Sequence, residues 1–230
     1  MNSPTITAFT IILTVVSYII SRGIYLRTQN ALLAPLLLST TAIILVLHFT
    51  GITFDQYKPG KSIMTFLLGP ATVGLALPLY QNRRVLMESF IPILTGIVCG
   101  SVATLTTAVV LARMNGLDAL IVKSIATKSI TAPIAIDVSR IIGGDSAIAV
   151  AFVVFTGTLG AMIGAGFLTL CRITNPVARG LAMGVTAHGQ GTATILQEGQ
   201  TQGAMAGVAM GVAAIFTSLI APFYIPMLLK

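Results

Sequence analysis

The chain has 230 residues, of which 55% are hydrophobic and only 8% charged, and its mean hydropathy is +0.96. A soluble domain does not need this much apolar surface, so the composition excludes an ordinary soluble protein and indicates lipid as the main solvent. The net charge is +7, but the basic residues are scattered between apolar runs without a patch of interleaved aromatic residues. We expect one integral membrane domain over residues 1–230, with basic loops at lipid head groups and no nucleic-acid partner.

About eight hydrophobic segments follow one another along the chain, separated by short polar links. They are residues 5–21, 31–50, 62–80, 89–112, 121–145, 146–171, 180–198 and 201–229. Residues 51–61 read as a turn-rich loop, and Pro70 and Pro78 predict an interrupted helix in the third segment. The predicted fold class is all-α: a polytopic transmembrane helical bundle with two or three discontinuous segments.

The most unusual stretch is residues 121–145, IVKSIATKSITAPIAIDVSRIIGGD, which is charged although it lies between two strongly apolar segments. Pro133 lacks an N–H group and clashes with the preceding turn, so we expect a helix to break near Thr131 and restart at Pro133. Two half-helices inside a membrane leave unpaired backbone groups, which are tolerated only when they are buried in protein or line a watered cavity. This stretch is therefore the first candidate site.

Lys128 is the strongest single candidate for function. A lysine in the middle of a spanning segment costs about 2.5–3.5 kcal/mol on translocon scales, so it normally faces an interior cavity or an ion pathway. The alternative is snorkelling of the ammonium group to the head groups, which we favour for Lys123. For Lys128 we favour the cavity, because Ser124, Ser129 and Thr131 offer polar partners nearby.

The restart of the helix at Pro133 would add a partial positive charge to the same place. The free N–H groups beside Thr131 and Ala132 form the positive end of the helix dipole. A carboxylate held there would satisfy these donors and pair with Lys128. We therefore expect Lys128, Ser129, Thr131 and Pro133 to bind a small anion.

Residues 180–198, GLAMGVTAHGQGTATILQE, form a second breakable stretch, because glycines weaken the helix around His188 and Gln190. We expect His188, Gly191 and Thr192 to close the anion site from this second segment. Paired broken segments in corresponding positions are typical of transporters.

The spacing of the two broken stretches indicates a possible internal repeat. Residues 89–112 precede Lys128, and residues 146–171 precede His188. The two broken centres lie 60 residues apart, from 128 to 188. The residue identities themselves do not repeat.

Two residues are candidates for proton coupling. His188 has a reference pKa near 6.5, which suits proton uptake, but it equally fits a neutral imidazole bonded to Gln190 or Thr192 in a packed core. Asp137 either takes up a proton or is neutralised by Arg140, three residues further along the same helical face. We favour neutralisation for Asp137 and leave both readings open for His188.

Glycines at four-residue spacing predict close helix packing at two places. They are Gly96 and Gly100 in one segment and Gly203, Gly207 and Gly211 in the last one. Small residues at this spacing allow helices to approach closely, within the chain or between copies in a homo-oligomer. We expect these glycines to pack helices together and the chain to form a homo-oligomer.

Enzyme signatures are missing from the sequence. Two distant histidines and two isolated cysteines make no metal set, so we expect no metal and no cofactor. Ser124 and Lys128 are spaced as in a serine–lysine hydrolytic pair, but no third orienting group or oxyanion site accompanies them. We therefore expect that the protein is not an enzyme.

Six motifs together resemble the LrgB/CidB family of bacterial inner-membrane proteins, in one order over nearly the whole chain. They are LLGPATVGLALPLYQ at 67–81, KSITAPIA at 128–135, IIGG at 141–144, ARGLAMG at 178–184, the HxxGTA pattern at 188–193 and TSLIAPF at 217–223.

The resemblance implies two different functions. Family members are similar to the C-terminal half of the plant plastid glycolate/glycerate translocator, and several bacterial relatives are associated with pyruvate uptake. This implies a carrier for small monocarboxylates, which we expect to be proton coupled. Other members are described as antiholin-like or holin-like regulators of murein hydrolase activity and cell lysis, which implies a regulator without its own substrate site. The family also implies a bacterial inner-membrane location and a smaller LrgA/CidA-type membrane partner.

Overall fold

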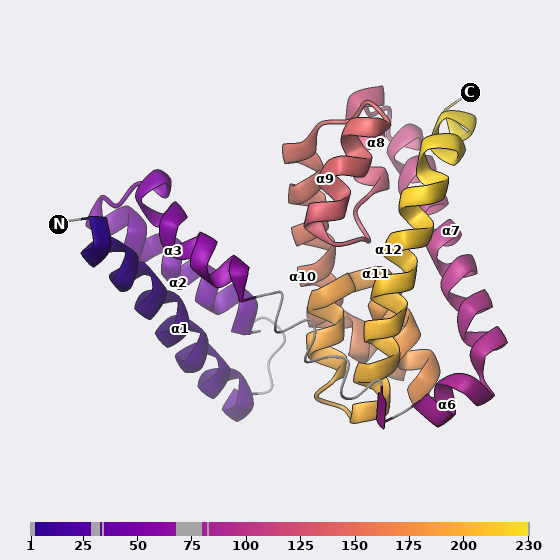
Figure 1. Cartoon of the computed structure of the whole chain (residues 1–230), viewed down its shortest axis with the longest axis horizontal. Helices are drawn as coiled ribbons and strands as arrows, with labels where there is room; N and C mark the ends of the chain where they lie inside the picture. The colour runs from indigo at the N-terminus through magenta and orange to yellow at the C-terminus, as the bar shows by residue number, and fades with distance from the viewer. Residues whose placement is uncertain (1–2, 29–32, 34, 68–79, 82, 230) are drawn as a thin grey trace. The chain divides into compact units, whose positions relative to one another are not determined.

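The structure is a computed structural model that describes residues 3–28, 33, 35–67, 80, 81 and 83–229. These residues form ten α-helices and no strand, so the all-α prediction is confirmed for the described part of the chain. The chain divides into two compact units, Met1–Gly74 and Leu75–Lys230 (Figure 1). Each unit is described by itself.

Unit 1 contains α1 (Ser3–Thr28), α2 (Pro35–Thr50) and α3 (Phe54–Phe66), and α1 contacts both of the others. Helix α1 continues beyond the predicted end of its apolar run, through Arg22 and Arg27. The predicted segment ended just before the first charged residue. A charged residue ends an apolar run, but it does not by itself end a helix.

The prediction of a loop over residues 51–61 was wrong, because most of this stretch belongs to α3. A reciprocal cap begins the helix: the Thr53 N–H donates to Gln56 Oε1 at 2.9 Å, and the Gln56 N–H donates to Thr53 Oγ1 at 3.4 Å. This capping box satisfies two backbone donors that a helix start leaves free. The predicted interruption at Pro70 and Pro78 lies outside the described residues.

Unit 2 is built on three long apolar helices: α7 (Phe90–Met114), α10 (Ser146–Leu170) and α12 (Gln200–Leu228), with the short α6 (Arg83–Glu88) before them. Together with α1, they are the four helices of the described residues that are long and apolar enough to cross a membrane, by length and composition. Their outward faces carry many exposed large hydrophobic side chains, such as Phe155 and Phe223. Such a surface suits contact with lipid.

Helix α11 (Pro176–Ile195) lies among the long helices and contacts α7, α10 and α12. Glycines allow this close packing. A Cβ on Gly184 would collide with the Ala206 backbone of α12, and one on Gly100 would lie 3.2 Å from Val185 Cγ1. The small residues of three helices therefore hold α11 in the core of unit 2.

Candidate functional site

The first broken segment folds into a pair of half-helices, α8 (Ala119–Ala126) and α9 (Ala132–Ile141). The predicted break is confirmed: Thr131 is the N-cap of α9, and Pro133 lies in its first turn. Residues 127–131 connect the two half-helices. We call α8, α9 and this connection the first hairpin, and residues 127–131 its tip.

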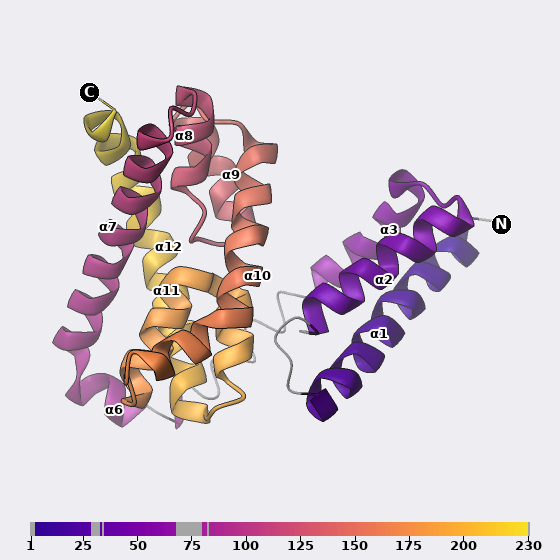
Figure 2. The ribbon, with the colours of Figure 1, turned by 180° about the vertical axis from the view of Figure 1, so that it is seen from behind.

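The first hairpin returns to the end from which it entered. The Asp145 N–H, at the start of α10, donates to Ser124 Oγ of α8 at 2.8 Å, across 21 residues of chain. Gly144 is packed so closely here that an added Cβ would lie 2.6 Å from Ser139 Oγ. Figures 1 and 2 show α8 and α9 in the half of unit 2 that contains the C-terminus.

Lys128 lies at this tip and is partly buried. Its Nζ donates to Ser129 Oγ at 3.1 Å. The ion pairs of the described residues are Lys58–Asp55, Arg84–Glu88 and Arg179–Glu198, so Lys128 has no carboxylate partner among them. A partly buried ammonium without a counter-ion is costly, and a bound anion would offset that cost.

The start of α9 adds free donors beside this lysine. Thr131 has an extended backbone and makes no side-chain capping hydrogen bond to the first turn of α9. The first N–H groups of a helix have no partner within the helix. An anion at the tip would therefore meet backbone donors as well as the ammonium group.

Lys128 also lines a groove between α7 and α8 with a volume of about 340 Å³. The other lining residues are Thr107, Ala108, Leu111, Ala112, Asn115, Leu117 and Ile125. Most of them belong to α7, a helix that was not predicted from the sequence to take part in the site. The contact with α7 could not be predicted, because the direction of a side chain at a hairpin tip depends on tertiary packing and not on residue spacing.

The second hairpin is α11, which reverses its direction at His188. The His188 backbone has φ 41° and ψ −130°, far from helical values. A straight helix would separate residues 179 and 198 by about 28 Å, yet Arg179 Nη2 lies 2.5 Å from Glu198 Oε1. The second broken stretch is therefore also a hairpin, with His188 at its tip, and it lies in the half of unit 2 that contains α6 (Figures 1 and 2).

His188 is buried, and its ring Nε2 lies 3.0 Å from the Val153 carbonyl of α10. A carbonyl only accepts, so Nε2 carries the proton in this contact. The partner is thus a backbone group of α10, rather than Gln190 or Thr192. Gln190 instead accepts a hydrogen bond from Thr158 at 3.2 Å.

Gly157 explains why the second tip fits against α10. An added Cβ at this position would lie 2.6 Å from His188 Cε1 and 2.7 Å from Gln190 Oε1. Because Gly157 has no side chain, it leaves the space that the second tip occupies. Because Val153, Gly157 and Thr158 lie near the middle of α10, the second tip lies near the middle of a helix long enough to span a membrane.

The structure brings together some of the predicted site residues and separates others. Lys128, Ser129 and Thr131 share the first tip, whereas Gly191 and Thr192 stabilise the second hairpin from within. Thr192 Oγ1 donates to the His188 carbonyl at 2.8 Å. No hydrogen bond among the described residues joins the two tips, but Ile130 of the first tip shares a hydrophobic cluster with Val153, whose carbonyl faces His188.

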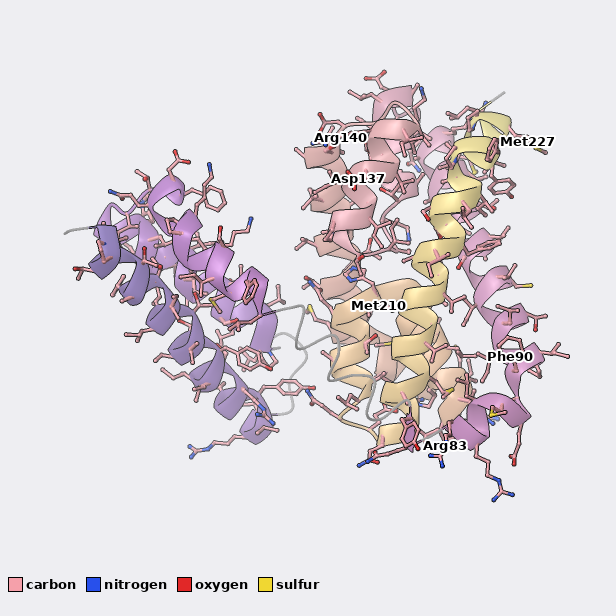
Figure 3. All side chains as sticks on the ribbon, viewed as in Figure 1. Arg83, Phe90, Asp137, Arg140, Met210 and Met227 are labelled. Carbon is pink, nitrogen blue, oxygen red and sulfur yellow. The ribbon has the colours of Figure 1, made fainter. Side chains whose placement is uncertain are left out.

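Asp137 and Arg140 lie on α9, at the same end of unit 2 as Met227 and away from Phe90 and Arg83 (Figure 3). Both are exposed, and they do not form the predicted ion pair. Arg140 Nε donates to Ser146 Oγ at 3.1 Å instead. Helical spacing allows such a pair without forcing it, and Ser146 offers Arg140 a closer partner.

A charged pair that was not predicted from the sequence closes the second hairpin. Arg179 is buried and donates to both oxygens of Glu198, and also to Thr169 Oγ1 and the carbonyls of Ile173 and Ala165. The sequence does contain a signal for this pair. An arginine begins the first half of the broken segment, and a lone acidic residue ends the second half.

Ser124 and Lys128, although spaced as in a serine–lysine hydrolytic pair, do not bond to each other. Ser124 Oγ donates to the Leu120 carbonyl at 2.7 Å and accepts from the Asp145 N–H. Lys128 donates to Ser129. The serine hydroxyl is therefore used to close the first hairpin.

Two long helices each lead into a hairpin, and the hairpins enter from opposite ends of unit 2. Helix α7 precedes the hairpin of α8 and α9, and α10 precedes the hairpin of α11 (Figures 1 and 2). This arrangement has the form of an inverted repeat, which is found in many membrane transport proteins. The fold and the tips thus define a multi-pass helical membrane protein with paired discontinuous segments.

The chain belongs to the LrgB-like family, whose model matches residues 14–227. It is 33% identical over 211 residues to "Uncharacterized protein YwbG" of Bacillus subtilis (strain 168), covering 92% of this chain and 94% of that protein. It is 31% identical over 219 residues to "Antiholin-like protein LrgB" of Bacillus mycoides (strain KBAB4) and of Bacillus cereus (strain B4264), covering 95% of each chain. No solved structure matches the chain.

Proposed function

We propose that this protein is a carrier for small monocarboxylates of the pyruvate, glycolate or glycerate type in a bacterial inner membrane. The observation that carries the proposal is Lys128, a partly buried ammonium at a hairpin tip without a carboxylate partner among the described residues. Such a group needs an anion, and the uncapped start of α9 beside it offers further donors.

In this proposal, the carboxylate lies against Lys128, Ser129 and Thr131 and the free backbone N–H groups of the first turn of α9, which contains Pro133. Lys128 supplies the charge, and Ser129 has a hydroxyl proton left to donate, because it accepts from Lys128. One elementary positive charge matches one carboxylate. The paired hairpins support alternating access, because each tip can open toward the end from which its own hairpin enters.

Proton coupling is proposed to involve His188. Its Nε2 already carries a proton toward the Val153 carbonyl, so uptake of a second proton would occur at Nδ1. Asp137, which is exposed on α9, is the weaker candidate for this role.

A second candidate function is regulation of murein hydrolase export and cell lysis, without a substrate site. The observation that favours it is the name "Antiholin-like protein LrgB" carried by relatives that match 95% of this chain. A regulator would act through helix surfaces and through an LrgA/CidA-type partner or further copies of the chain. Gly207 and Gly211 would suit such contacts, because nothing lies within 4 Å of a Cβ placed on either of them.

The test is uptake of labelled pyruvate and glycolate into proteoliposomes that contain the purified protein, with and without an imposed pH gradient. A carrier shows saturable uptake that empty liposomes lack, and proton coupling makes the uptake depend on the gradient. If the protein shows no uptake alone, the assay is repeated with the LrgA/CidA-type partner in the same liposomes. Absence of uptake in both preparations contradicts the carrier proposal and leaves the regulator.

A further inference from the structure

The groove beside Lys128 offers a specific path for the anion. It lies between α7 and α8, has a volume of about 340 Å³ and includes Lys128 in its lining. Its other polar lining residues are Thr107 and Asn115, both on α7 or at its end. The volume corresponds to roughly ten water molecules in the liquid, which is ample for an acid of two or three carbons.

One face of α7 forms the wall of this groove. Thr107, Leu111 and Asn115 are spaced four residues apart, so they lie in a line along the helix. Asn115 is the C-cap of α7, and the line from it to Thr107 extends about 12 Å into unit 2. The groove therefore extends from the end of a helix long enough to span a membrane toward its middle.

The hydrogen bonds of the wall determine which ligand groups it can hold. Asn115 Nδ2 donates to the Leu111 carbonyl at 2.8 Å, and the Thr107 hydroxyl donates to the Ala103 carbonyl at 2.7 Å. The Thr107 hydroxyl therefore presents an acceptor oxygen to the groove, and Asn115 keeps its side-chain oxygen and one N–H, but neither side chain carries a charge. Lys128 is the one cation among the described residues that line it.

We propose that this groove is the carboxylate pathway, in which Lys128 holds one carboxylate at the inner end and the α7 wall excludes a second. The inference rests on the proposed carrier function and deepens it. A second carboxylate on the ligand would face the neutral side chains of Thr107 and Asn115, without a cation to balance its charge. The groove thus selects monocarboxylates over dicarboxylates.

The pathway is tested with single cysteines in a protein whose two native cysteines, Cys99 and Cys171, are replaced by serine; both are exposed and free. Leu111→Cys places a thiol in the groove, and Val110→Cys places one on α7 outside the groove lining; both side chains are exposed, Leu111 by 58% and Val110 by 41%. The reagent is an anionic, membrane-impermeant methanethiosulfonate. We expect Leu111→Cys to react, and saturating pyruvate to slow the reaction at least threefold, with no protection at Val110→Cys.

The outcomes separate the pathway from the carrier function. If the cysteine-free protein transports pyruvate but pyruvate gives no protection at Leu111→Cys or at Thr107→Cys, the groove is not the pathway and the carrier proposal stands. If pyruvate protects Leu111→Cys although the cysteine-free protein does not transport pyruvate, the groove stands as a binding site and the carrier proposal fails.

Selectivity is tested by adding a second cation to the wall. Malonate should compete poorly with labelled pyruvate in the unmodified protein and at least tenfold better in Asn115→Lys. Asn115→Gln, which keeps a neutral side-chain amide, should leave malonate as poor a competitor as it is in the unmodified protein. Equal inhibition by malonate in all three proteins would overturn the proposed exclusion of dicarboxylates.

Discussion

Arg179 and Glu198 form an ion pair in which Nη2 and Oε1 lie 2.5 Å apart, although nineteen residues of chain separate them. The Arg179 side chain is only 9% exposed and also binds Thr169 and two backbone carbonyls. This cluster joins the end of α10 to both ends of α11. It therefore fixes the base of the second hairpin and, through it, the position of His188.

Removal of the arginine should destabilise the protein strongly. Arg179→Ala leaves Glu198 and several buried acceptors without a donor, which typically costs about 3–5 kcal/mol. We expect a fall of at least about 6 °C in the melting temperature of the purified protein in detergent.

The matched control is Arg84→Ala, which removes the exposed pair with Glu88, whose side chains are 89% and 63% exposed. An exposed pair of this kind contributes about 0–1 kcal/mol, so little change is expected. Similar melting temperatures for both variants would contradict a structural role for the Arg179 cluster.

His188 has a backbone conformation that glycine adopts more easily, with φ 41°. His188→Gly and His188→Ala both remove the ring and its hydrogen bond to Val153, but only glycine relieves the backbone strain. We expect His188→Gly to be more stable than His188→Ala by about 1 kcal/mol, measured by thermal unfolding. Both variants should lose pH-driven uptake. If His188→Gly kept uptake, the histidine ring would have no part in transport.

Two glycines on neighbouring helices should respond differently to alanine. A Cβ on Gly184 would collide with the Ala206 backbone, whereas nothing lies within 4 Å of one on Gly211. Gly184→Ala should cost about 1–3 kcal/mol through overpacking, and Gly211→Ala should change the stability by less than about 0.5 kcal/mol. Thermal unfolding in detergent measures both. Equal losses would show that Gly211 is covered by another surface, such as a partner or a second copy.

The sequence predicted where the helices break, but not the direction that the chain takes after each break. Pro133 removes a backbone donor, so the break before α9 follows from local chemistry. A break does not determine where the chain goes next. The return of each hairpin depends on contacts between distant residues, Ser124 with Asp145 and Arg179 with Glu198, which local patterns do not specify.

Only part of the candidate site was predicted, because contacts between distant residues are again not specified by local patterns. Lys128, Ser129 and Thr131 are neighbours in sequence and share the first tip. The α7 wall with Thr107 and Asn115 was not predicted, because these residues look ordinary in an apolar helix and acquire a role only through packing against α8. Spacing within a segment predicts shared faces, but contacts between segments require the fold.

The central claim is that the Lys128 ammonium binds the transported carboxylate, and it is tested most directly by comparing two lysines of the same hairpin. Lys123 is also partly buried, with Nζ beside the Gly143 turn at the base of the hairpin instead of at its tip. In proteoliposomes, Lys128→Ala should abolish saturable pyruvate uptake while remaining folded, and Lys123→Ala should keep most of it. Undiminished uptake in Lys128→Ala would contradict the account.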